Sequence, residues 1–315
     1  MKDALIFIDT NIFLDFYRIT GRDTKLSILS LIDDNQGRII TGEQVEMEYK
    51  KNRQGRILEA MRSLKQNGPS HLQPPAFLKE AQPSRMIAKN IEQIKKQTGR
   101  IEKRLERALS DPAQYDPIYQ CLQRLFRADC DYHLTSSKGT WKQMWSSAQR
   151  RFLRGYPPRK SADTSCGDAV NWEWIVHCAA ESKRNIVLVS RDQDYGQVLD
   201  DRPVLNDWLQ TEFKERTGKK RKIVLTNRLT SAFQIVSIKA TKEQISEEQS
   251  IPPDHADPTD EGAVRQEFDY SGVFAKVQLQ REVLQAQAKC SALFVKIARL
   301  KQAIEECETS SKRNP

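Results

Sequence analysis

Two aspartates in this sequence lie shortly after apolar runs, a position from which their carboxylates could bind a metal ion. Asp9 comes directly after the apolar run 4–8, and Asp192 follows the run 186–189, with Asp194 beside it. Apolar runs without polar alternation are typical of strands buried on both faces of a parallel sheet. Ligands of such sheets bind beyond the carboxyl ends of the strands. We therefore expect these acids to lie at one edge of a sheet.

Glu48 and Asp168 are two further candidate acids for this edge. Each acid has an ordinary alternative role, since Asp9 and Asp168 could cap helices, Asp192 could belong to a turn and Glu48 could be an exposed charge. Four carboxylates gathered together, however, repel one another unless a cation holds them. Oxygen ligands without His or Cys nearby suit Mg²⁺ or Mn²⁺ rather than zinc. Such a site supports hydrolysis of a phosphodiester, with the metal activating water.

Strand and helix signals alternate along the chain and define the expected fold class. The expected strands span residues 4–8, 38–40, 186–189 and 222–227. Their apolar character and the helices between them predict an α/β fold, an open parallel sheet flanked by helices. Residues from about 54 to 154 lack strand signals and are rich in Lys, Arg, Gln and Glu. They predict a large helical insertion.

The domain organisation follows from composition and from two heptad seams. We expect a first domain over 1–242, a linker over 243–262 and a C-terminal helical or coiled-coil segment over 263–315. Apolar residues step by four and three over 87–108 and again over 279–307. A narrow apolar stripe must be covered. The two seams therefore cover each other, or the C-terminal helix pairs with its copy in a homodimer.

The candidate acids also lie in four segments that resemble the motifs of PIN-domain nucleases, in particular a bacterial PIN-like branch with a long helical insertion. The segments are FIDTNIFLDFYR (7–18), QVEMEYKKNR (44–53), PPRKSADTSCGDAVNW (157–172) and VLVSRDQDYG (187–196). The resemblance covers about residues 4–240. It implies a PIN-like fold and products with a 5′-phosphate and a 3′-hydroxyl. The catalytic metal ligands that it implies are Asp9, Glu48, Asp168 and Asp192, with Asp194 beside them.

Two of these ligand assignments have alternatives in the sequence. Helical spacing does not separate Glu48 from Glu46, because both flank the same helix face. Asp163 stands five residues before Asp168 and could replace it. Only the resemblance selects Glu48 and Asp168.

Five polar residues near the acids have expected roles, either in orienting the acids or in contacting the substrate. Asn11 and Ser190 would orient the carboxylates by hydrogen bonds, or would form only local turns. Arg53, Arg159 and Lys160 would contact nucleic acid.

Charge and composition favour a polyanionic partner. The chain has a net charge of +9, and residues 50–111 contain 15 Lys or Arg against 6 Asp or Glu. RNA or another nucleic acid is the expected partner. Aromatic residues that could stack on bases are Trp141, Trp145, Tyr156 and Trp172, with core packing as their alternative. No stretch reaches the roughly 18 apolar residues of a membrane span, so we expect no membrane partner and a cytoplasmic location.

These observations together predict a metal-dependent endonuclease that acts on single-stranded RNA. A toxin and a phage-defence effector are two biological roles consistent with this activity. The alternatives are a DNA nuclease using the same site, a PIN-like binding module without turnover and a phosphatase of the haloacid dehalogenase type. The phosphatase is the weakest, because its chemistry needs a second acid two residues after the first, where this chain has Asn11.

Overall fold

The computed structural model describes residues 1–19, 21–66, 74–158, 165–200 and 202–251. Three residues considered above, Arg159, Lys160 and Asp163, lie outside the described residues. The heptad seam over 279–307 also lies outside them, so its coiled coil and its pairing in a homodimer stay predictions.

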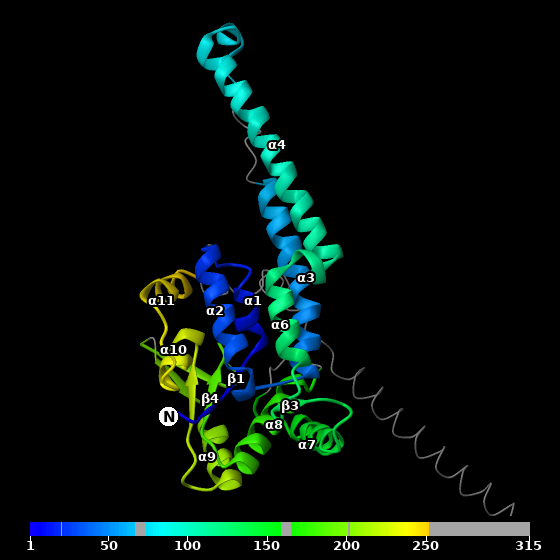
Figure 1. The fold of residues 1–315 in the computed structure, drawn as a ribbon, viewed down its shortest axis with the longest axis vertical. Helices are drawn as coiled ribbons and strands as arrows, with labels where there is room; N and C mark the ends of the chain where they lie inside the picture. The colour runs from blue at the N-terminus through cyan, green and yellow to red at the C-terminus, as the bar shows by residue number, and fades with distance from the viewer. Residues whose placement is uncertain (20, 67–73, 159–164, 201, 252–315) are drawn as a thin grey trace, which may run out of the picture. The chain divides into compact units, whose positions relative to one another are not determined.

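Five parallel strands form the central sheet in the order β3-β2-β1-β4-β7 (Figure 1). The strands are β1 (Leu5–Ile8), β2 (Ile39–Gly42), β3 (His133–Leu134), β4 (Ile186–Val189) and β7 (Ile223–Thr226). Every residue of β1 and β4 is buried, as expected for strands covered on both faces. The predicted α/β fold with an open parallel sheet is therefore confirmed.

The strand order places a topological switch point at the centre of the sheet. From β1 the chain moves through β2 to β3 on one side, and later through β4 to β7 on the other. The pairing of β1 with β4 runs in register from Leu5 and Ile186 to Ile8 and Val189. A crevice beyond the carboxyl ends of the strands forms where the order reverses, which here is between β1 and β4.

Helices flank this sheet, and Figure 1 shows α2 and α6 on one side of the strands with α8 and α9 on the other. The helices of the α/β core are α1 (Thr10–Asp15), α2 (Arg22–Asp34), α8 (Gly167–Ser182), α9 (Asp207–Thr217) and α10 (Leu229–Ile235). An antiparallel hairpin that the sequence did not predict, β5 (Gly196–Leu199) with β6 (Arg202–Leu205), precedes α9. Within the described part of the chain, no helix has the length and apolar character needed to cross a membrane.

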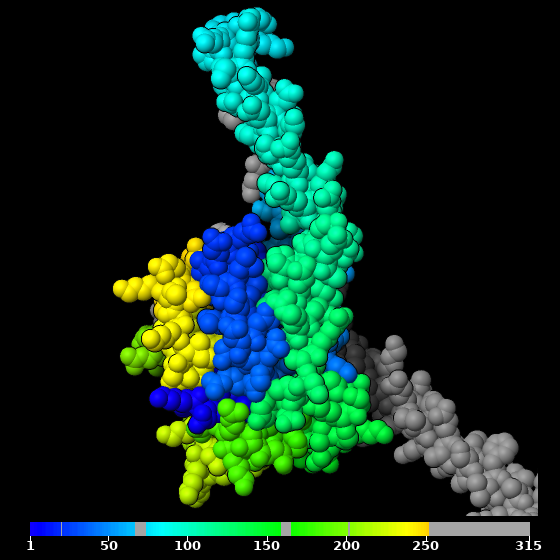
Figure 2. Space-filling model, in the orientation of Figure 1, coloured from blue at the N-terminus to red at the C-terminus, as the bar shows by residue number. Residues whose placement is uncertain are grey.

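The insertion is mainly helical, as predicted, and its two longest helices project from the rest (Figures 1 and 2). Its helices are α3 (Glu43–Gln66), α4 (Gln82–Ser110), α5 (Pro112–Tyr115), α6 (Pro117–Arg127) and α7 (Trp141–Leu153), with two short 3₁₀ turns, η1 (Gln36–Arg38) before it and η2 (Ala76–Leu78) within it. The expectation of no strand here is wrong, because β3 lies within it and pairs with β2. A strand of two residues is too short to show a hydrophobic period. Three isoleucines of the α4 seam, Ile87, Ile94 and Ile101, are exposed.

A buried ion pair anchors the insertion to the core. The Arg53 Nε atom lies 2.8 Å from Oδ2 of Asp116, and both side chains are 3% exposed. The Tyr17 hydroxyl donates to the same carboxylate at 2.6 Å, and Arg53 also donates to the carbonyl oxygen of Ala108. The expected role of Arg53 in binding nucleic acid is therefore wrong, because its guanidinium is enclosed in the protein.

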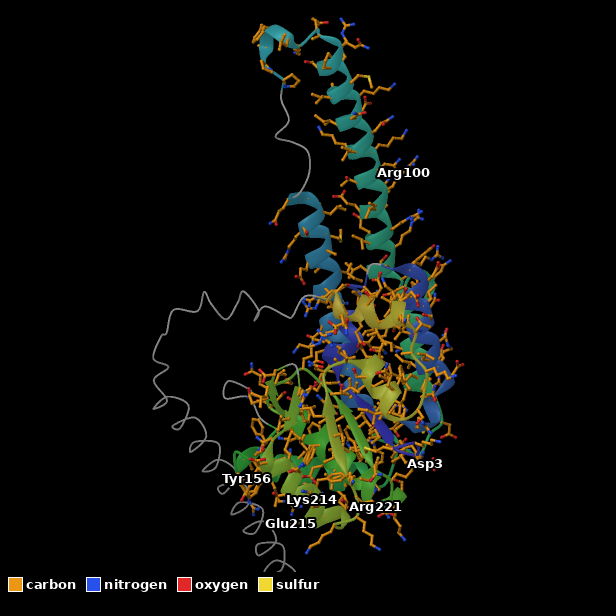
Figure 3. The ribbon with its side chains drawn as sticks, turned by 90° about the vertical axis from the view of Figure 1, so that its left-hand side faces the viewer. Asp3, Arg100, Tyr156, Lys214, Glu215 and Arg221 are labelled. Carbon is orange, nitrogen blue, oxygen red and sulfur yellow. The ribbon has the colours of Figure 1, made fainter. Side chains whose placement is uncertain are left out.

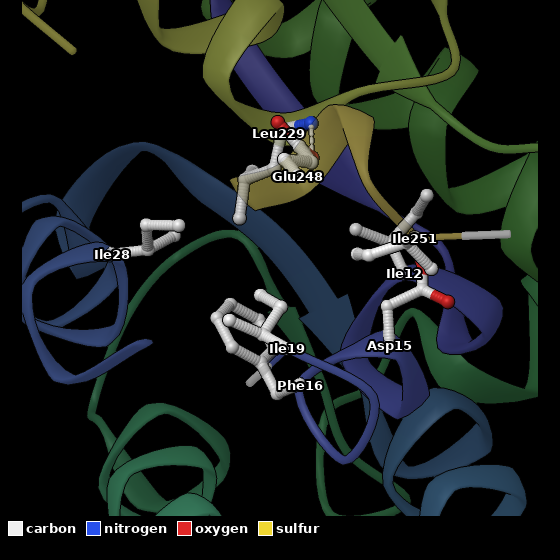
Figure 4. A pocket seen from close by; sticks show the side chains of 8 residues that line it. All are labelled: Ile12, Asp15, Phe16, Ile19, Ile28, Leu229, Glu248 and Ile251. Carbon is white, nitrogen blue, oxygen red and sulfur yellow. Dashed lines mark hydrogen bonds between the residues drawn. The ribbon is translucent and has the colours of Figure 1, made fainter. Parts of the chain in front are cut away.

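The first part of the predicted linker is folded. Residues Lys242–Gln249 form α11, whose Glu248 carboxylate accepts hydrogen bonds from the backbone N–H of Leu229 (2.5 Å) and Thr230 (2.9 Å) at the start of α10. Glu248 also lines a pocket of about 10 Å³ between α10, α11, α1 and α2 (Figure 4). Thr241 and Gln244 form a capping box at the start of α11. This signal was present in the sequence but was outweighed by the acidic, Pro-containing composition.

Candidate active site

Asp9 lies at the carboxyl end of β1 and receives three hydrogen bonds. Its Oδ1 accepts from the backbone N–H of Thr10 at 2.7 Å, which caps α1. Its Oδ2 accepts from the Asn11 side-chain amide at 3.0 Å and from the Ser190 hydroxyl at 2.5 Å. Asp9 thus caps α1 and also accepts hydrogen bonds from Asn11 and Ser190.

Three aspartates lie close to one another beside this carboxylate. Ser190 follows β4, and its hydroxyl accepts from the Asp192 backbone N–H at 2.9 Å. The Asp192 carboxylate in turn accepts from the Asp194 backbone N–H at 3.2 Å. Asp168 is in the first turn of α8. One carboxylate oxygen from each of Asp168, Asp192 and Asp194 lies within 4.8 Å of the other two, a spacing that one cation could bridge.

Glu48 reaches the site from α3. Its Oε2 accepts from the Thr10 hydroxyl at 3.2 Å, and its Oε1 accepts from the Gln44 amide at 2.6 Å. A Cβ atom on Gly167 would lie 2.3 Å from the Glu48 Oε1 atom, so this carboxylate rests against the start of α8. Only a glycine leaves room for it there.

Glu46 is turned away from this cluster. Its Oε1 accepts from Lys50 Nζ at 2.6 Å and from the Gln123 amide at 3.2 Å. The geometry therefore favours Glu48 over Glu46. Asp168 lies in the cluster, whereas its alternative Asp163 falls outside the described residues.

The surroundings of Asp9 disfavour the charged form of its carboxylate. The pKa of Asp9 is raised to about 7, mainly by burial and also by the negative charges of Asp192 and Glu48, while hydrogen bonds from Ser190 and Thr10 act in the opposite direction. A carboxylate so placed gains its charged form when a cation is bound nearby. The donor set of carboxylate oxygens fits a hard divalent cation.

Sequence reasoning missed two residues that support the site. Gln44 lies four residues before Glu48, one helical turn away, and that spacing could have identified it. The guanidinium of Arg191 pairs with both carboxylate oxygens of Asp15 on α1 and donates to the Asn227 carbonyl at 3.4 Å. No sequence spacing signals this pair, because the two residues are 176 positions apart.

A parallel sheet with carboxylates gathered beyond the ends of its central strands is an α/β arrangement in which ligands bind at the strand ends. The family model described as PIN domain matches residues 6–195. The chain therefore belongs to the PIN-domain family, whose members are generally nucleases. No curated protein and no solved structure matches the chain significantly. The resemblance noted in the sequence is confirmed.

Replacing Gly167 with Ala is expected to displace Glu48 without unfolding the protein. The added Cβ would meet only the ends of the flexible Glu48 and Gln44 side chains, which can move away. Mn²⁺ affinity, measured by titration calorimetry, should fall by about tenfold, as for other losses of ligand orientation. Gly55→Ala is the control, since Gly55 lies on the same helix as Glu48 and its Cβ would meet nothing within 4 Å. Equal affinities in the two variants would contradict the position given to Glu48.

The metal-free protein is expected to lose stability as the pH rises from about 4 to about 7. With a folded-state pKa of about 7, Asp9 binds its proton more tightly in the folded than in the unfolded chain, so its stabilising protonation is lost over this interval. Asp9→Asn removes this titration. The free energy of unfolding of Asp9→Asn, measured in urea with EDTA, should therefore rise relative to wild type with pH. A difference that does not change with pH would count against the raised pKa.

Proposed function

We propose that this protein is a metal-dependent endonuclease that hydrolyses phosphodiester bonds. The observation that carries the proposal is the cluster of Asp168, Asp192 and Asp194, with Asp9 and Glu48 hydrogen-bonded beside it at the switch point of the sheet. Membership of a family of nucleases supports the same reaction.

In this proposal the five acids hold one or two Mg²⁺ or Mn²⁺ ions. A bound ion would activate water and offset the charge that develops on the phosphate. The protein itself orients the acids, because Ser190 links Asp9 to the loop that carries Asp192. Thr10 joins Asp9 to Glu48 through its backbone N–H and its hydroxyl. The family pattern supports products with a 5′-phosphate and a 3′-hydroxyl.

The competing functions fit the geometry less well. A phosphatase of the haloacid dehalogenase type would need an acid at position 11, but the Asn11 amide donates to Asp9 and has no proton to transfer in acid catalysis. A binding module without turnover would have no need for a cluster of acids that disfavours its own charge and repels phosphate.

We further propose that the substrate is a single strand of RNA. Tyr156 and Trp208 form an exposed aromatic pair, with ring centroids 5.1 Å apart and side chains 38% and 51% exposed. Exposed rings of this kind suit stacking on unpaired bases. Trp172, by contrast, packs in the core, and Trp141 stacks on Trp145 in a partly buried pair.

The aromatic pair is joined to the acid cluster through short connections. The Asn206 backbone N–H donates to the Tyr195 carbonyl at 2.9 Å, so Trp208 begins α9 directly beside the loop that carries Asp194. Tyr156 stands just before Pro157, whose carbonyl accepts from the buried Arg151. Arg151 also bonds acids on α8 and α9, which fixes the segment near Tyr156 to both helices.

The basic insertion is a separate surface for phosphates. Figure 3 shows Arg100 on α4 far along the projecting helix and Tyr156 toward the opposite end of the ribbon. Lys and Arg along α3 and α4 would add affinity that falls with salt and is independent of sequence. The aromatic pair is therefore the better place to test strand type.

Asp9→Asn and Glu48→Gln are expected to reduce cleavage of a single-stranded RNA by at least about 100-fold, because each removes a charge from the proposed metal site. Glu46→Gln is the matched control on the same helix, and its cleavage rate should stay near wild type. EDTA should stop cleavage by wild type, and Mn²⁺ or Mg²⁺ should restore it. Full activity of a folded Asp9→Asn protein would exclude the proposed metal site.

Trp208→Leu, made in the Asp9→Asn background, is expected to weaken single-stranded RNA binding by about tenfold, since one stacked base is lost. Trp208→Phe keeps a ring and should bind within a few-fold of its parent. Fluorescence anisotropy with matched single-stranded RNA, single-stranded DNA and duplex DNA measures both. Equal binding by the Leu and Phe variants would exclude stacking, and tighter binding of the duplex would favour a DNA nuclease on the same site.

A further inference from the structure

Tyr195 places a hydroxyl in the interior beside the acid cluster. Its side chain is 0% exposed, and its hydroxyl has no hydrogen-bond partner among the described residues. A buried polar group without a partner is costly and rare in folded proteins. A partner that binds to the folded protein and accepts a hydrogen bond from this hydroxyl would remove that cost.

The position of Tyr195 connects it to the candidate metal site. It directly follows Asp194, and its backbone N–H donates to the Asp192 carbonyl at 3.3 Å, so it belongs to the same turn. Its backbone carbonyl accepts from Asn206, which fixes the residue from the other side. The backbone of Tyr195 is thus held within the loop that carries two of the clustered acids.

The charges of the cluster act on this hydroxyl. Burial raises the pKa of Tyr195 well above its usual value, and the negative charges of four acids raise it further; these acids are Asp168, Asp9, Asp192 and Glu48. A phenol hydroxyl can donate one hydrogen bond, and this one has no acceptor among the described residues.

We propose that Tyr195 is a positioning residue whose hydroxyl donates a hydrogen bond to a carboxylate or water oxygen of the acid cluster when a divalent cation is bound. The inference rests on the proposed metal site and adds a donor that the acids themselves lack. It gives the bound state a hydrogen bond that the metal-free protein does not have. Such outer contacts fix the orientation of metal ligands.

The proposal predicts opposite effects of Tyr195→Phe on two measurements in the full-length chain. Without metal, the melting temperature in EDTA should stay equal to wild type or rise, because the substitution removes only an unpaired hydroxyl. With metal, the dissociation constant for Mn²⁺ should increase about tenfold. Titration calorimetry with MnCl₂ and thermal unfolding in EDTA measure the two quantities.

Tyr17→Phe is the control with the reverse pattern. Its hydroxyl lies within 3.0 Å of partner atoms on Asp116, Tyr49 and Arg53, so its loss should lower the melting temperature in EDTA and leave Mn²⁺ affinity unchanged. Unchanged Mn²⁺ affinity of Tyr195→Phe would overturn the role of Tyr195 while leaving the metal site intact. A lower melting temperature in EDTA would overturn it as well, because the hydroxyl would already be paired. Absence of Mn²⁺ binding by wild type would overturn both this role and the proposed metal site.

Discussion

The parallel pairing of β1 with β4 is the constraint on which the site depends. Because Ile8 pairs with Val189, the two strands end at the same level, and the Asp9 backbone N–H donates to the Val189 carbonyl at 2.9 Å. The next residue on each strand is then a functional one, Asp9 on one side and Ser190 on the other. A slip of one residue in this register would turn the side chains of the shifted strand to the opposite face of the sheet and separate Asp9 from Ser190. The buried apolar runs that fix the register therefore also fix the chemistry.

The same arrangement lowers the stability of the protein, because it brings several negatively charged side chains together. Acids that are gathered and partly desolvated disfavour one another, and a protein tolerates this only where the surrounding fold determines their positions. Among the described residues, neutral groups donate to two of these acids: Thr10, Asn11 and Ser190 donate to Asp9, and Gln44 donates to Glu48. A neutral donor orients a carboxylate without adding an opposite charge to it.

The sequence predicted the centre of the fold well, for physical reasons. The runs at β1 and β4 are apolar without interruption, which few structures other than doubly buried strands require. Ser190 was expected to orient carboxylates or to form a local turn, and its hydrogen bond to Asp9 joins two residues that come directly after these strands. The choice of Glu48 over Glu46 did not follow, since two positions on one helix differ by a rotation that only tertiary packing fixes.

The periphery was predicted less well, because its signals are short or depend on distant partners. The strand β3 and the hairpin of β5 and β6 are too short to show a period against their surroundings. Arg53 looked like a surface cation in a basic stretch, but Asp116, 63 positions later, brings it into the interior. Glu248 looked like one acid of a linker, and its partners at Leu229 and Thr230 give it a structural role.

The long helix α3 runs from the candidate site into the insertion. Glu48 lies in its second turn and Gln66 at its far end, about 27 Å away at the rise of an α-helix. The buried ion pair of Arg53 and Asp116 holds the helix in place between these two points. One continuous helix therefore carries both an acid of the candidate site and the first part of the insertion.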